Sequence, residues 1–113
     1  MEARVKTRIW VQAFLRRTEA DGFMAALRTR GDEDAGAVLV KVNRFDAGCL
    51  VYTQVRDEGG NPAWLAGTGA SSVPETDADA YIERQRGYDA DLWVIEIEDP
   101  KSAYGIDGVV LDS

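Results

Sequence analysis

The chain has 113 residues, of which 45% are apolar, so its length and composition fit one globular domain with a buried core. Thirteen Lys and Arg against twenty Asp and Glu give a net charge of −7, which argues against a nucleic-acid backbone as partner. The sequence contains no histidine, which excludes Ser-His-Asp and Cys-His catalysis and the zinc sites that need imidazole ligands.

Cys49 is the single cysteine, which excludes a disulfide within the chain and a four-thiolate metal site. Its neighbours, 48–52, are typical of a strand, so we expect a buried thiol that acts as a small apolar side chain. No run approaches the roughly 20 apolar residues of a membrane span. The apolar run 9–15 ends in Arg16-Arg17 instead of a cleavage site, so we do not interpret it as a signal peptide. We expect a cytoplasmic protein without membrane contact.

The first half of the chain predicts a helix followed by strands. Residues 1–8 alternate loosely between apolar and basic side chains, which fits either a short strand or a frayed start. From Ile9 to Asp21 apolar side chains recur at helical spacing, and Gly22 provides a stop. Strands are then predicted, separated by an acidic loop at 31–36 and by tight turns, over 23–30, 37–42, 48–56 and 63–66.

The second half predicts one more helix and one more strand. Thr76 and Asp79 have the spacing of a capping box, so we expect a helix from Thr76 to about Arg86, ended by Gly87. The most regular strand is 92–98, where large apolar residues alternate with glutamates. One face of this strand is therefore expected to be dry and the other wet.

This order of elements predicts one α+β domain over residues 1–113. Three consecutive strands with short turns favour a mostly antiparallel sheet of four to five strands, with two helices packed on one face. Residues 100–113 form an edge strand, a docking segment for a partner or a flexible tail. The three tryptophans are expected to pack in or near one core, with Trp64 as the alternative anchor for a partner.

Charge is distributed unevenly along the chain. Residues 1–30 carry seven basic and three acidic side chains, so their net charge is +4 and that of the remainder is −11. Two interpretations stay open. The basic part lies against acidic parts of the same chain or of a dimer, or it forms a surface for an anionic partner.

The acidic loop holds the densest cluster of candidate functional side chains in the sequence. Asp32, Glu33 and Asp34 supply the oxygen ligands that Mg²⁺ and Ca²⁺ prefer, although their spacing is not that of an EF-hand. Arg30 and Lys41 are close in sequence and are candidates to neutralise the loop instead. In that case the loop is a solvated turn between strands.

Three stretches of the sequence, 9–17, 31–42 and 77–85 with 91–94, resemble a small alphaproteobacterial family catalogued as domain of unknown function 1491. The most specific part is the Gly-Asp, Ala-Gly and Lys-Val pattern within 31–42, and the resemblance covers nearly the whole chain. It implies a stand-alone cytoplasmic protein. It implies no reaction, so it assigns no functional residue.

The missing residue types favour a non-enzymatic protein-binding or adaptor domain that uses a protein partner or self-associates as a homodimer, without a cofactor. The alternative is a small carboxylate-based enzyme or ligand binder, with a divalent metal at the loop 32–34. The residues expected to take part in interactions are Arg30, Asp32, Asp34, Lys41 and Trp64.

Overall fold

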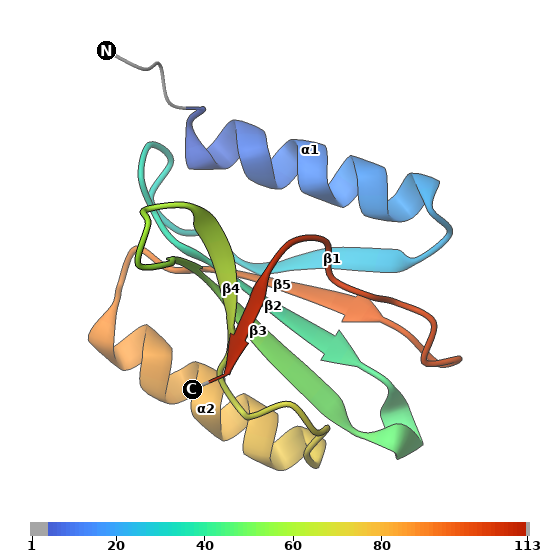
Figure 1. Ribbon diagram of the computed structural model, residues 1–113. Helices are drawn as coiled ribbons and strands as arrows, with labels where there is room; N and C mark the ends of the chain where they lie inside the picture. The colour runs from blue at the N-terminus through green and yellow to red at the C-terminus, as the bar shows by residue number, and fades with distance from the viewer. Residues whose placement is uncertain (1–4, 113) are drawn as a thin grey trace.

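The computed structural model describes residues 5–112, and within that range the chain forms two α-helices, a short 3₁₀ helix and six strands (Figure 1). In chain order these elements are α1 (Thr7–Ala20), β1 (Met24–Thr29), β2 (Val38–Asn43), η1 (Phe45–Ala47), β3 (Cys49–Arg56), β4 (Pro62–Ala66), α2 (Glu75–Tyr88), β5 (Trp93–Glu98) and β6 (Val110–Asp112). Neither α-helix in this range is long and apolar enough to cross a membrane.

The described strands form one mixed sheet in the order β1-β5-β2-β3-β4-β6. The meander β2-β3-β4 is antiparallel, as the short turns predict, and β1 pairs antiparallel with β5. The prediction of a mostly antiparallel sheet of four to five strands is wrong in part, because the described sheet has six strands and is mixed, with β5 parallel to β2 and β6 parallel to β4. β5 follows α2 in the chain but lies between β1 and β2 in the sheet. The pairing of strands so far apart in the sequence has no local sequence signature.

The helices cover opposite faces of the sheet, so the prediction that both pack on one face is wrong (Figure 1). Every residue of the central strand β2 is buried, which means that both faces of the sheet need a cover. Val11 of α1 packs on what we call the α1 face, and Ala78 and Ile82 of α2 pack on the α2 face. The predicted α+β class is confirmed.

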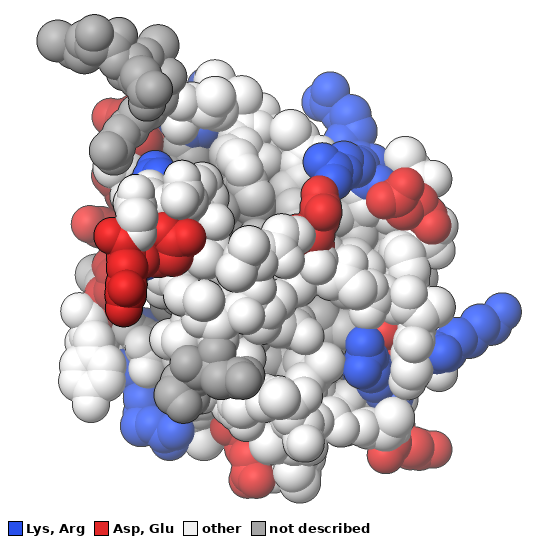
Figure 2. All heavy atoms as spheres, viewed as in Figure 1, with Lys and Arg blue, Asp and Glu red and all other residues white. Residues whose placement is uncertain are grey.

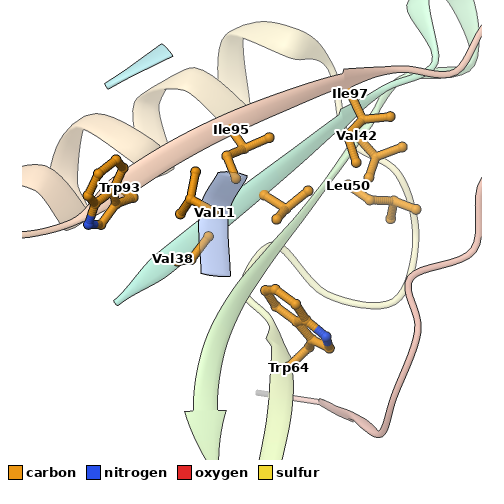
Figure 3. Packing of buried hydrophobic residues seen from close by; sticks show 9 residues of the cluster. Val11, Val38, Val42, Leu50, Trp64, Trp93, Ile95 and Ile97 are labelled. Atoms are coloured by element: carbon orange, nitrogen blue, oxygen red, sulfur yellow. The ribbon is translucent and has the colours of Figure 1, made fainter. Parts of the chain in front are cut away.

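The larger core lies on the α1 face (Figure 3). Its buried members are Val11, Val38, Val40, Val42, Leu50, Trp64, Trp93, Ile95 and Ile97. Trp10 packs against this cluster, so all three tryptophans belong to one core, as predicted. The smaller α2-face cluster contains Cys49, which is fully buried, as the strand pattern around it predicts.

The helix ends differ from the predictions by a few residues. α1 begins at Thr7, so residues 5 and 6 are not in a strand, and residues 1–4 lie outside the described range. α2 begins after Pro74, and no side chain caps it, so the predicted capping box at Thr76 is wrong. Proline suits a helix start because it lacks the N–H that would stay unpaired there. The predicted stop at Gly87 is also wrong, because α2 continues through Gly87 and ends at Tyr88.

Candidate functional site

The acidic loop 31–36 caps the start of α1. The first turn of a helix leaves backbone N–H groups without helical partners. Here the N–H groups of Thr7 and Arg8 donate to the carbonyl oxygens of Asp34 at 3.4 Å and Glu33 at 3.0 Å. The Thr7 hydroxyl donates to the Gly36 carbonyl at 2.9 Å. The acidic loop therefore has a structural role, and its carboxylates lie near the positive end of the helix dipole.

Asp32 organises the loop from within. Its Oδ2 accepts the N–H groups of Asp34 at 3.2 Å and Ala35 at 2.9 Å. Its carbonyl oxygen accepts the indole N–H of Trp93 at 2.7 Å, which ties the loop to the core. Among residues 5–112, no three His, Cys, Asp or Glu side chains are arranged to hold a metal ion. The geometry of the loop is that of an internally hydrogen-bonded turn.

Four of the basic residues of the N-terminal part pair with acidic residues of the same chain. The ion pairs are Lys6–Asp34, Arg17–Asp107, Arg28–Glu96 and Arg30–Glu33. These four pairs agree with the first interpretation of the uneven charge, in which the basic part lies against acidic parts of the same chain. Arg30, which also lies over the Trp93 ring at 5.7 Å, neutralises the acidic loop, whereas Lys41 does not.

Lys41 lies instead at the centre of an ionic cluster on the α2 face, and only 4% of the Lys41 side chain is exposed. Its ammonium contacts three carboxylates: Oε2 of Glu75 and Oδ1 of Asp79, both at 2.8 Å, and Oε1 of Glu96 at 3.5 Å. Burial alone would lower the pKa of Lys41, but the hydrogen bonds to Asp79 and Glu75 and the charge of Glu96 raise it above its ordinary value. A permanently protonated amine suits an ion pair and not a nucleophile.

Asn43 extends this cluster. Its Nδ2 donates to Glu75 at 3.1 Å and to Glu96 at 3.3 Å, and its Oδ1 accepts the backbone N–H of Phe45 at 2.8 Å. The Cys49 thiol also faces Oδ1, at 3.6 Å. Burial raises the pKa of this thiol above its ordinary value, so it lacks the thiolate character of a reactive cysteine.

A polar cleft of about 360 Å³ opens beside the cluster, between α2, β1 and β5. The two arginines on its walls are matched by carboxylates, since Arg28 pairs with Glu96 at 3.5 Å and Arg86 with Glu83 at 2.9 Å. The arginines that line the cleft therefore form ion pairs with carboxylates of the same chain. Its arrangement is that of a structural clamp between α2 and the sheet.

A larger groove, of about 760 Å³, lies on the α1 face between α1, the β3–β4 hairpin and the segment 104–108. Trp10 and Phe14 of α1 stack at a ring distance of 5.0 Å and an interplanar angle of 12°. Trp64 of β4 lies tilted against both, at 6.0 and 6.4 Å, and Figure 3 shows its indole at the margin of the core. We call this the aromatic groove.

The C-terminal segment, which follows β5, forms one wall of the aromatic groove. The carboxylate of buried Asp99 holds the beginning of this segment in place. The Asp99 carboxylate accepts Nε–H of Arg44 at 2.9 Å and the backbone N–H groups of Ala103 at 2.8 Å and Tyr104 at 3.1 Å. Burial alone would raise the pKa of Asp99, but these hydrogen bonds and the charge of Arg44 lower it. Burial raises the pKa of Tyr104, which lines the groove, to about 12, so its hydroxyl stays neutral.

The same segment fixes Trp64. The indole N–H donates to the carbonyl oxygen of Asp107 at 3.0 Å, and the backbone N–H donates to that of Val109 at 2.8 Å. β6 then continues parallel to β4. Trp64 is thus held on its polar side by the C-terminal segment and on its apolar side by the core.

The structure brings two of the five predicted interaction residues to one site, because Asp34 and Trp64 both line the aromatic groove. Arg30 lies beside the acidic loop and Asp32 lies within it. Lys41 lies on the other face of the sheet. Sequence reasoning did not assign Trp10, Phe14 and Tyr104 to a site. The spacing of four between Trp10 and Phe14 is the signal that points to a shared helix surface.

The comparisons with known proteins agree with this description of the fold. A family described as "Protein of unknown function (DUF1491)" matches residues 5–107. The crystal structure of a DUF1491 family protein from Caulobacter crescentus CB15 is 37% identical, covers 96% of this chain and 100% of its own, and superposes with a TM-score of 0.82. An NMR structure of a DUF1491 family protein from the same organism is 36% identical, with coverage of 97% and 99% and a TM-score of 0.79.

The solution structure of a protein from A. tumefaciens is 29% identical, with coverage of 86% of this chain and 87% of its own and a TM-score of 0.71. No curated protein matches the sequence. The family match spans nearly all of the described residues, and two of the similar structures cover almost the whole of both chains. The resemblance inferred from the sequence is confirmed, and the chain belongs to the DUF1491 family.

Proposed function

We propose that the chain is a non-enzymatic binding module that takes a short segment of another protein into the aromatic groove. The main support is the trio Trp10, Phe14 and Trp64, whose rings meet in a groove of about 760 Å³ at the surface. Tryptophan and other aromatic residues are enriched at the energetic centres of protein interfaces, because a rigid ring buries a large apolar area at a small cost in entropy.

The surface around the groove supports the same proposal. Figure 2 shows that the middle of the face that carries β4 and β6 holds few charged side chains, which lie mainly around its margin. Val109 and Val110, which flank β4 there, are exposed. An apolar centre within a polar rim is the usual anatomy of a protein interface.

The lining of the groove indicates the chemistry of the bound segment. The lining carries both signs of charge, with the basic residues Arg17 and Arg56 and the acidic residues Asp21, Asp34 and Asp107. Such a rim selects neither a strongly acidic nor a strongly basic ligand. We therefore expect an extended segment with one large apolar side chain, which packs against the exposed edges of Trp10 and Phe14 in the groove, flanked by polar residues of either charge.

Selection of random peptides on the purified full chain tests the proposal. Peptides that bind are expected to carry a large aromatic or aliphatic residue, and their binding should change the fluorescence of Trp10 and Trp64. The matched variants are Val5→Glu and Ile9→Glu, because Val5 lines the groove and Ile9 does not, while their side chains are 63% and 47% exposed.

Val5→Glu is expected to weaken binding of the selected peptides by about tenfold, because it places a charge at the apolar lip, a loss of about 1.4 kcal/mol. Ile9→Glu should leave the affinity unchanged. Circular dichroism should show both variants folded. Selected peptides that bind both variants as tightly as the unchanged chain, or a selection that yields no binding peptide, would remove the proposal.

A further inference from the structure

The two edges of the described sheet differ in length and protection. The β6 edge has three residues, whereas β1 presents six residues whose outer side has no strand partner within residues 5–112. An unpaired edge strand is a template for another strand, and proteins usually protect such edges with charges or bulges. On β1 the register shift and the charge of Arg28 lie beyond Leu27, in the last two residues of the strand.

The first four residues of β1, Met24 to Leu27, carry no charge and no bulge. Met24 is 70% exposed and Leu27 is 40% exposed, so two large apolar side chains stand at an open edge. Between them lie Ala25 and Ala26, whose small side chains put no bulk in the way of an approaching backbone.

We infer that β1 pairs antiparallel with β1 of a second copy of this chain, across a two-fold axis perpendicular to the sheet. Such an axis keeps each face of the sheet on its own side, so residues that lie opposite one another must point to the same face. With Ala26 on the axis, Ala25 lies opposite Leu27 of the second copy, and Met24 lies opposite Arg28 of the second copy. The two sheets then form one continuous sheet.

Charge complementarity favours a second copy over an unrelated strand. Met24 pairs with Glu98 of β5, a half-buried residue that has no ion pair within the described part of the chain. Arg28 is 61% exposed and has only a long contact, 3.5 Å, with Glu96. In the paired sheet, Arg28 of the second copy lies two strands from Glu98, roughly 10 Å between backbones.

The long Arg and Glu side chains can span that separation across the Met24 side chain. Because the axis repeats every contact, each dimer would contain two such pairs. The same register keeps Arg28 of one copy away from Arg28 of the other. The edge is thus complementary to itself in shape, apolar character and charge.

The oligomeric state of the full chain, measured by sedimentation over a range of concentrations, tests this inference. The unchanged chain is expected to dimerise reversibly. Arg28→Glu and Glu98→Arg should each weaken the dimer by about tenfold, because each places like charges together. The double variant Arg28→Glu with Glu98→Arg should restore it. Arg16→Glu, an exposed residue of α1, is the control and should leave the dimer unchanged.

Circular dichroism of each variant separates a loss of fold from a loss of association. Amide exchange gives a second readout, since residues 24–27 should become protected as the concentration rises. A chain that is monomeric at every concentration, or a dimer that neither single variant weakens, overturns the inference. Val5→Glu should leave the dimer intact, so the groove and the β1 edge can fail independently.

Discussion

The two faces of the sheet hold their helices by different means. On the α1 face the helix contributes Trp10, Val11 and Phe14 to the larger apolar cluster. On the α2 face the helix buries only Ala78 and Ile82 and packs the partly buried Tyr81 beside them, and the Lys41 ionic cluster adds polar contacts to this smaller apolar attachment. A helix with a narrow apolar stripe therefore depends on ion pairs for its position. The helix that packs through large rings leaves an aromatic groove between itself and the C-terminal segment.

The largest expected effect is on the α2 face. Lys41→Met should lower the free energy of unfolding by about 3 kcal/mol, because it leaves the partly buried carboxylate of Glu96 and those of α2 without their cation. This loss is at the lower end of the range expected when a buried ion pair is broken, because the side chains of Glu75 and Asp79 are about half exposed. Urea unfolding followed by circular dichroism measures the change.

Lys101→Met is the matched control, because Lys101 is exposed and has no ion pair within residues 5–112. Its effect should stay within about 0.5 kcal/mol. A raised pKa means that the Lys41 contribution is complete below the unfolded value of about 10.4 and is lost only as the pH rises through the folded value. The difference between the unchanged chain and Lys41→Met should therefore be constant from neutral pH to about pH 10. Equal effects of the two substitutions would contradict the ionic clamp.

The next effect concerns the wall of the aromatic groove. Asp99→Asn should lower the free energy of unfolding by about 2 kcal/mol near neutral pH, because it leaves Arg44 without its carboxylate and weakens the bonds to Ala103 and Tyr104. The pKa of Asp99 is lowered in the folded chain, so its contribution is complete above the unfolded value of about 3.9. The contribution is lost as the pH falls through the folded value.

Urea unfolding at several pH values measures this second change. The gap between the unchanged chain and Asp99→Asn should be widest near neutral pH and should close in acid. A gap that is independent of pH would show that the carboxylate charge does not hold this wall.

The sequence predicted local elements better than their arrangement. The alternation of large apolar residues with glutamates located β5, and the helical spacing of Trp10 and Phe14 located α1. The placement of β5 between β1 and β2 depends on partners far along the chain and leaves no local pattern. Because that placement buries both faces of β2, it also puts the helices on opposite sides.

The candidate site shows the same limit. The sequence offers Trp64 only as an alternative anchor for a partner, because it is a large ring on a short predicted strand. The groove around Trp64 was not predicted, because its wall depends on distant residues: Arg44 and Tyr104, which meet through a hydrogen bond of 2.9 Å, are 60 residues apart in the sequence. Lys41 was assigned to the acidic loop by its proximity in sequence, whereas its true partners lie on α2 and β5.

The smallest expected effect sharpens the contrast between the faces. The Arg17–Asp107 pair, at 2.8 Å, joins α1 to the C-terminal segment across the mouth of the aromatic groove, and both side chains are exposed. Exposed pairs contribute little because water screens them, so Asp107→Asn should change the free energy of unfolding by no more than about 0.5 kcal/mol. Urea unfolding at low and high salt measures it, and the change should vanish at high salt. A loss as large as that of Lys41→Met would mean that the α1 face also depends on ion pairs, and the distinction between the two faces would not hold.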